Sequence, residues 1–437
     1  MPRRGGMSTH LQVPPAKADG TCRNCEGVAI PVAIPDWGHW CPIDERRATR
    51  ALPGHQETSM FELIVARVAR VARALAVASL SLLAFQACAQ IRVGQTTGFT
   101  GVSAAAVKET SAGAALWLDA VNAKGGVNGQ KIELISLDDK SDPKVAAANA
   151  QSLIEQRKVV ALFLTRGTPT TEAIIPLLDR YGVPLVAPST GAMVLHTPVK
   201  THVFNVRTPY QLEAAKAIPQ LASMGFTRVG VLQTNDDFGR DTIVGAQRGF
   251  EASKLKPVFV ETFERIKPDF SAIASRVARE NLQAVLILGS GSAVQAAMTA
   301  IRAAGSKAQV VALSNTASAG LIADLGANAR GLIVTQVFPS ERSMSVPMVK
   351  QANDLLQAKN AGAKLSPAML EGFAAAKVLV EALRRAGKSP SSESVQHALE
   401  ELYFDLGGLS ISYSPSRHTG LESSALSIVD ANGRFQR

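Results

Sequence analysis

The stretch "NAKGGVNGQKIELISLDDKSDPKVAAANAQSLI", Asn122–Ile154, holds a helix end, a strand and a helix start in close succession. Its Gly-Gly pair closes an apolar-periodic segment that predicts a helix over residues 109–126. The next apolar run predicts a strand over residues 130–139. An Asp-Pro pair then places Pro143 at the first position of another helix, where its missing N–H is not needed. This order is typical of an α/β protein.

The same alternation of strands and helices extends along the chain, with a break near residues 202–210. The strands are nearly continuous apolar runs, which favours parallel sheets covered by helices on both faces. Two such runs predict two doubly wound domains, in which ligands bind beyond the carboxyl ends of the strands. The predicted strands are 91–96, 130–139, 159–164, 183–189, 228–234, 256–263, 284–290 and 309–314, and the predicted helices are 109–126, 142–156, 169–182, 211–225, 239–253, 269–281 and 293–305.

The first 59 residues are rich in Pro, Gly and Arg and show neither helical nor strand periodicity. We interpret residues 1–59 as a disordered extension or as the product of a mis-assigned start codon. The alternative is a zinc site, because these residues contain the pattern C-x2-C-x13-H-x-C. Its ligands would be Cys22, Cys25, His39 and Cys41.

Residues 60–89 have the organisation of a secretory signal peptide. Basic residues precede an apolar core over residues 74–85, which is too short to span a bilayer, since about 20 residues are needed. Ala87-Cys88-Ala89 fits the small-x-small cleavage rule. The alternatives are an amphipathic helix at the membrane surface and lipid attachment at Cys88. We therefore expect a periplasmic protein whose mature chain begins near Gln90.

Composition excludes some classes of function. The chain has 437 residues, 46% of them hydrophobic, which suffices for two globular domains. Its formal net charge is +10, but the basic residues form no stripe or cluster, so we expect no nucleic-acid binding. All four cysteines lie at or before Cys88, so the mature chain has no disulfide.

The motifs of enzymes are weak in this sequence. "LILGSGSAVQAA", Leu286–Ala297, resembles a dinucleotide loop, but Val294 stands at the third glycine position. The acidic cluster in "LDDKSDP", Leu137–Pro143, indicates either a solvated turn with a helix start or a cation site. No nucleophile-and-base pair is evident. We expect no catalytic residue, no metal and no cofactor.

Hydroxyl and amide side chains follow the predicted strands instead. Such neutral groups, beside the N–H groups of helix N-termini, suit a carboxylate or another polar ligand. The alternative is helix capping, and Thr168 before Pro169 would be a good N-cap. Arg166 is either a second anchor for an anion or a solvated strand end. The hydroxyl and amide residues that follow the predicted strands are Thr168, Thr170, Thr171, Ser189, Thr190, Ser290, Ser292, Ser314, Asn315 and Thr316.

The quoted stretch resembles the opening of the leucine/isoleucine/valine-type substrate-binding proteins of ABC transporters. Further segments with such similarity are 183–195, 235–251, 269–289 and 408–435, so the resemblance covers nearly all of Gln90–Arg437. It implies a type I periplasmic binding protein, a two-lobed α/β clamshell. Each lobe would have a doubly wound, mostly parallel sheet with helices on both faces.

The resemblance also implies three hinge crossings, near residues 207–210, 336–339 and 404–408. The expected division of the chain follows from these crossings: 1–59 extension, 60–89 signal peptide, 90–208 with 338–406 lobe 1, and 209–337 with 407–437 lobe 2.

The family's ligand contacts are carried over by position. The resemblance implies that Thr168 and the loop Ser189–Gly191 hold a ligand carboxylate, although the family often has threonine at the place of Gly191. It places Asn315 where the family has an acidic residue for the ligand amine, and Ser290 where the family has an aromatic residue. These departures leave the α-amine open, so we hypothesise that the ligand is a carboxylate or another small polar organic compound, with or without an α-amine. The predicted site is Arg166, Thr168, Thr170, Ser189, Thr190, Gly191, Phe238, Ser290 and Asn315.

The resemblance implies a monomeric solute-binding protein and no enzyme. It would capture an amino acid or a related carboxylate between its lobes and deliver it to the permease subunits of an ABC importer at the inner membrane. One alternative is a ligand-sensing clamshell of a signalling system. Another is an enzyme on a doubly wound fold.

Overall fold

A computed structural model describes residues 65, 67, 68 and 90–436. The interpretations of residues 1–59 and of Cys88 therefore lie outside the described residues, as does the signal peptide over 60–89 apart from three positions. No helix among the described residues combines the length and the apolar character needed to cross a bilayer.

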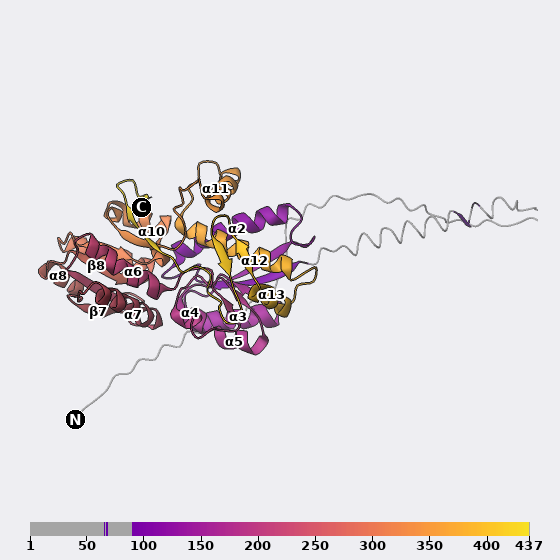
Figure 1. Cartoon of the computed structure of the whole chain (residues 1–437), viewed down its shortest axis with the longest axis horizontal. Coiled ribbons are helices and arrows are strands. Elements are labelled where there is room, and N and C mark those ends of the chain that lie inside the picture. Colours follow the sequence, from indigo (N-terminus) through magenta and orange to yellow (C-terminus); the bar gives the residue numbers. More distant parts are fainter. Residues whose placement is uncertain (1–64, 66, 69–89, 437) are drawn as a thin grey trace, which may run out of the picture. The chain divides into compact units, whose positions relative to one another are not determined.

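The first sheet has five parallel strands in the order β2-β1-β3-β4-β5. One core, built around α2 and α12, covers one face, and a second core, built around α3 and α5, covers the other (Figure 1). The strands are β1 (Ile91–Thr97), β2 (Ile132–Asp138), β3 (Ala161–Phe163), β4 (Leu185–Val186) and β5 (Val203–Phe204). The helices are α2 (Ala104–Ala123), α3 (Pro143–Glu155), α4 (Thr168–Glu172), α5 (Ile175–Tyr181), α11 (Pro347–Lys359), α12 (Pro367–Arg385) and α13 (Ser392–Glu400).

The alternation of side chains explains why this sheet is covered twice. In β3, Phe163 lies in the core beside α2 and α12, whereas its neighbour Leu162 lies in the core beside α3 and α5. Successive residues of a strand point to opposite faces. An unbroken apolar run therefore has no face left for solvent.

The second sheet repeats this order in its parallel part, β7-β6-β8-β9-β10, and adds the antiparallel strands β13 and β14. Helices α6 and α7 share a core with one face, and α8, α9 and α10 share a core with the other. The strands are β6 (Val229–Thr234), β7 (Val260–Phe263), β8 (Ala284–Leu288), β9 (Gln309–Ala312), β10 (Ile333–Gln336), β13 (Ala425–Val429) and β14 (Phe435–Gln436). The helices are α6 (Tyr210–Ser223), α7 (Asp237–Ala252), α8 (Ser271–Arg279), α9 (Gly291–Ala303) and α10 (Ala319–Leu325).

The chain passes between the two sheets after β5, after β10 and before β13. The last passage differs from the prediction near residues 404–408. There the chain forms a hairpin of β11 (Tyr403–Asp405) and β12 (Ser410–Ser412), and Ile411 and Leu421 lie in the core of the first sheet. Asn205 forms a parallel bridge with Thr419. The third crossing thus falls between Leu421 and Ala425.

Local predictions succeeded for most helices. Asp142 accepts hydrogen bonds from the N–H groups of Lys144 and Val145, and Pro143 opens α3, as predicted. The helix predicted over 169–182 is divided into α4 and α5. Pro176 has no N–H to donate to Glu172, so a continuous helix is interrupted there.

Candidate functional site

The carboxyl ends of the parallel strands in both sheets lie along one cleft, and several contacts join its walls. Glu109 of α2 accepts hydrogen bonds from the N–H groups of Ala319 and Gly320, at 3.0 and 2.7 Å. The Ser292 N–H donates to the carbonyl oxygen of Val102 at 3.4 Å. Arg166 of the first lobe donates to the carbonyl oxygen of Asn315 in the second.

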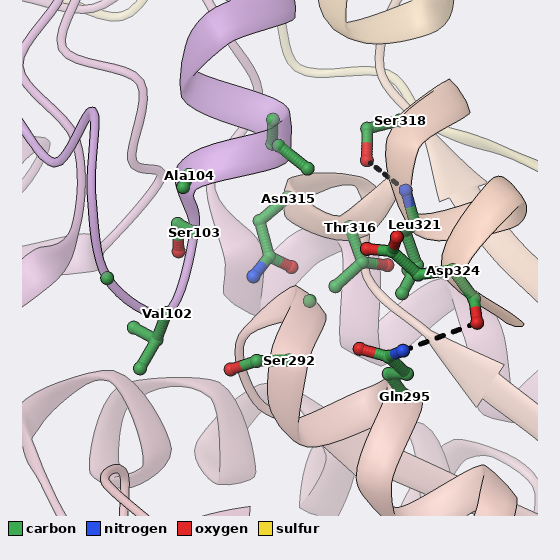
Figure 2. Close-up of a pocket in the computed structure, with 14 residues that line it drawn as sticks. Val102, Ser103, Ala104, Ser292, Gln295, Asn315, Thr316, Ser318, Leu321 and Asp324 are labelled. Carbon is green, nitrogen blue, oxygen red and sulfur yellow. Dashed lines mark hydrogen bonds between the residues drawn. The ribbon is translucent and has the colours of Figure 1, made fainter.

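Two cavities open in this cleft, and residues from both sheets line each of them. The larger has a volume of about 750 Å³, and the smaller, shown in Figure 2, about 150 Å³. Val102 and Ser103 belong to both walls, so the cavities adjoin each other. A volume of about 750 Å³ lies within the range of about 300–1,000 Å³ that is usual for small-molecule sites.

Arg166 connects the two halves of the cleft. It follows β3, lines the larger cavity and is only 7% exposed. One guanidinium nitrogen, Nη1, donates to Ser189 Oγ at 2.7 Å, and Nη2 donates to the carbonyl oxygen of Asn315 at 2.5 Å. Among residues 90–436 no carboxylate forms a direct ion pair with this guanidinium. Both of these acceptors are neutral. A guanidinium has five N–H donors, so these two hydrogen bonds do not use all of them.

A buried ionic network continues from Arg166. Ser189 Oγ donates to Glu371 at 2.7 Å, and Glu371 also accepts from Arg207 Nη1 at 3.3 Å. Arg207 Nη2 pairs with Glu213 at 2.8 Å. Both carboxylates are paired directly with Arg207, and Arg166 is connected to Glu371 only through Ser189.

Several residues predicted to bind ligand also have hydrogen-bond partners within the protein. Thr168 Oγ1 lies 3.0 Å from Thr190 Oγ1, and Thr170 donates to the carbonyl oxygen of Gly167 at 3.0 Å. Gly167, not Thr168, is the N-cap residue of α4, so the capping interpretation of Thr168 is wrong. Gly191 has no space for a side chain, because a β-carbon there would lie 2.6 Å from the carbonyl oxygen of Thr208.

Two predicted contacts from the second sheet also have internal roles. Phe238 is buried, and its ring packs edge-on against Tyr210 with centroids 5.1 Å apart. Ser290 caps α9 by accepting a hydrogen bond from Ala293 N–H at 3.4 Å. Of the nine predicted site residues, Arg166 and Thr170 line the larger cavity and Asn315 lines the smaller. The ligand role of all nine stays a prediction.

Sequence reasoning missed much of the cavity lining. Val102 and Ser103 follow β1, Lys140 follows β2, and Arg265 follows β7. The rule that ligands lie beyond strand ends would have found these residues, but only the hydroxyl-rich loops were selected. Glu371 carries no such signal, because it lies on α12, far from any strand end.

Carboxyl groups meet across the cleft between α4 and α7. Glu172 is half-buried, and its pKa is raised to about 7. Burial is the largest cause, the nearby Asp237 and Asp241 raise the pKa further, and Arg240 opposes them with a smaller effect. Asp241 also accepts hydrogen bonds from Gln211 Nε2 at 2.8 Å and from Met193 N–H at 3.1 Å. The charge on Glu172 is therefore sensitive to pH in the neutral range.

The acidic turn after β2 has structural partners. Asp138 accepts from Thr100 Oγ1 at 2.7 Å, and Asp139 accepts from Ser141 N–H at 2.8 Å. In residues 90–436 no group of three or more His, Cys, Asp or Glu side chains is placed to hold a metal ion.

The chain belongs to the periplasmic binding protein family, whose model matches residues 90–434. This confirms the predicted family and the two-lobed type I fold. The Leu/Ile/Val-binding protein of Escherichia coli K12 is 26% identical over 255 residues, which are 55% of this chain and 64% of that protein. The chain thus spans a little under two thirds of this relative.

Solved structures agree with the fold. A substrate-binding periplasmic protein from Ralstonia solanacearum has a TM-score of 0.73 and 32% identity, covering 79% of this chain and 99% of that one. A branched-chain amino acid ABC transporter protein from Thermus thermophilus with bound valine has a TM-score of 0.70 and 19% identity, covering 79% and 94%. The second likeness concerns the fold alone.

Proposed function

We propose that this protein is a periplasmic solute-binding protein that captures a small organic ligand between its lobes and delivers it to an ABC importer. The observation that carries the proposal is that both cleft cavities have walls from both sheets. A ligand in either cavity would touch both lobes and so favour the closed arrangement. The names of the relatives, Leu/Ile/Val-binding and substrate-binding periplasmic proteins, support this function.

The mechanism is closure about the three crossings, with no bond made or broken. A ligand shifts such an equilibrium only by its differential affinity for the closed state. The permease subunits would recognise the closed protein, which acts as a monomer and not as an enzyme. Lobe 1 would comprise residues 90–208 and 338–424, and lobe 2 the remainder, with the third crossing moved to follow Leu421.

The test uses protein secreted to and purified from the periplasm. Mass spectrometry of small molecules released on denaturation identifies the ligand, and small-angle X-ray scattering follows the radius of gyration as that ligand is added back. We expect one bound organic compound and a decrease in the radius of gyration. If no compound is released and no solute compacts the protein, the proposal is wrong.

A further inference from the structure

Asn315 has an acceptor that the protein leaves without a partner. Its Nδ2 donates to the carbonyl oxygen of Gly289 at 2.9 Å. This hydrogen bond fixes the orientation of the amide, because a carbonyl oxygen can only accept and must therefore face the NH2 group. Oδ1 then has no hydrogen-bond partner among the described residues. Asn315 is 9% exposed and lies in the wall of the smaller cavity (Figure 2). A buried acceptor of this kind calls for a donor.

The N-terminus of a long helix lies at the same cavity. Helix α2 has 20 residues, and its N-cap residue, Ser103, makes no side-chain capping bond. Ala105 and Ala106 of its first turn line the cavity. Unsatisfied N–H groups at a helix N-terminus favour an anion. Arg166 adds a full charge beside this end of the cleft, through its bond to the carbonyl oxygen of Asn315.

An ammonium group would find little compensation in this cavity. The buried carboxylates of Glu213 and Glu371 are bonded to Arg207, and the carboxylate of Glu109 is bonded to the N-terminus of α10. Asp324 lines the cavity, but it is exposed to solvent, where a single ion pair contributes little. A buried charge without a paired counter-charge is costly, whereas a neutral donor is not.

We propose that the cleft selects a carboxylate with a hydroxyl group beside it, in preference to an α-amino acid. The carboxylate would lie in the positive potential of Arg166 and the α2 N-terminus, and the hydroxyl would donate to Asn315 Oδ1. The rest of the ligand would extend past Val102 and Ser103 into the larger cavity, whose wall includes Pro143, Pro169 and Ile266. This inference rests on the proposed function, because it names the ligand class of the same cleft.

The experiment compares three compounds on one carbon skeleton by isothermal titration calorimetry: 2-hydroxy-4-methylpentanoate, 4-methylpentanoate and L-leucine. A second set uses lactate, propanoate and L-alanine. We expect the hydroxy acid to bind about tenfold more tightly than the acid without the hydroxyl, since one buried acceptor then stays unpaired. The amino acid is expected to bind most weakly.

Two variants test the roles of the residues. Asn315→Asp places a carboxylate at the donor-binding position, so we expect the order of hydroxy acid and amino acid to reverse. Arg166→Gln is expected to weaken every carboxylate by about 10- to 100-fold. Arg166→Lys keeps the charge and replaces the glutamine variant if that variant folds poorly. Its affinity for each carboxylate should be lower than that of the wild type but higher than that expected for Arg166→Gln. Arg279→Gln on the outer helix α8 is the matched control, and its affinities should equal those of the wild type.

The outcomes separate this inference from the proposed function. The inference is overturned if the wild-type protein binds the amino acid at least as tightly as the hydroxy acid. It is also overturned if Asn315→Asp leaves the order of the two affinities unchanged. In either case the proposed function stands as long as a ligand still compacts the protein. If neither set of compounds binds, the chemical class of the compound released on denaturation tests the inference. A hydroxy acid supports the inference, and a compound with an ammonium group or without a carboxylate overturns it. If no compound is released and no solute binds, both proposals are wrong.

Discussion

Buried charges join the two lobes at the first crossing. Arg207 is 1% exposed and Glu213 is 0% exposed, although one precedes α6 and the other lies in its first turn. Besides Arg207, Glu213 accepts hydrogen bonds from Ser314 N–H at 3.0 Å and from Thr335 Oγ1 at 2.5 Å. One carboxylate thus satisfies donors from the hinge, from the loop after β9 and from β10.

We expect Glu213→Gln to lower the free energy of unfolding by about 3–5 kcal/mol, since removing one partner of a buried pair leaves the other charge uncompensated. Urea titrations followed by circular dichroism measure this change. Glu261→Gln is the matched control, because Glu261 pairs with Arg276 at a site where both side chains are about one third exposed. We expect about 0–1 kcal/mol there. Equal losses in the two variants would contradict a special role of the buried network.

Glu172 gives the lobe contact a dependence on pH. Its folded-state pKa is raised from 4.5 to about 7, so the folded protein holds a proton that the unfolded chain has released between these values. The stabilisation is therefore complete below about pH 4.5 and is lost as the pH rises through 7. Between pH 5 and 8 the melting temperature of the wild type should fall relative to that of Glu172→Gln.

The difference between the two proteins isolates Glu172 from other groups, such as Asp139, whose pKa burial raises to about 6. A constant difference across the range from pH 5 to 8 would show that burial and the neighbouring Asp237 and Asp241 do not raise the pKa of Glu172.

At the scale of elements, α2 and α12 cross at two glycines. A β-carbon at Gly113 would overlap the carbonyl oxygen of Met369, and one at Gly372 would overlap that of Thr110. The two backbones thus approach closely, and any side chain at these positions would separate the helices. This close packing places Glu371, which neighbours Gly372, beside the hinge residue Arg207.

We expect Gly372→Ala to destabilise the protein by about 1–3 kcal/mol or more, despite the better helix propensity of alanine, because the clash involves backbone atoms. Gly291→Ala is the matched control, since a β-carbon at Gly291, in the first turn of α9, meets nothing within 4 Å. Thermal unfolding should show a loss for the first variant and none for the second. Equal melting temperatures would mean that α2 and α12 separate at little cost.

Local patterns predicted these elements well where the pattern is long. Helix α2 and strand β6 were evident from periodicity, whereas β5 has only two residues, Val203–Phe204, and was missed. The third crossing was placed too early, because the segment up to Leu421 is held by β5 and not by any local signal. The ion pair of Arg207 and Glu371 spans 164 positions, which no periodicity reveals. The short strand β5, the third crossing and the buried ion pair therefore depend on packing between segments that are distant in the sequence, which local patterns do not reveal.

At the scale of the whole molecule, polar contacts outside the cavities join the two lobes. Glu109 reaches from α2 to the N-terminus of α10, and Ser366 Oγ donates to the same carboxylate at 2.6 Å. Arg166, Ser292 and the pair of Met193 and Asp241 are among the further contacts between the walls. These polar contacts stabilise a closed arrangement, and a ligand would add to them. The resting balance between open and closed forms is therefore set partly by residues outside the cavities.

Glu109→Ala is the most direct test of that balance. Its removal takes away two charge-assisted hydrogen bonds across the cleft, worth together about 1–3 kcal/mol, which shifts the ratio of open to closed protein by about 5- to 150-fold. The apparent dissociation constant for the ligand equals the intrinsic one divided by the closed fraction, so affinity should fall by at most the same factor. Scattering should show a larger radius of gyration without ligand and the wild-type value at saturation.

Asp119→Ala is the matched control on the same helix, because Asp119 pairs with Lys359 of α11 within lobe 1 and does not cross the cleft. It should leave both the radius of gyration and the affinity unchanged. If Glu109→Ala changes the radius without changing the affinity, the ligand binds open and closed forms equally and cannot drive closure. If both quantities change together, contacts outside the cavities tune the affinity of the site, because the ligand then binds only the fraction of protein in which the lobes have already met.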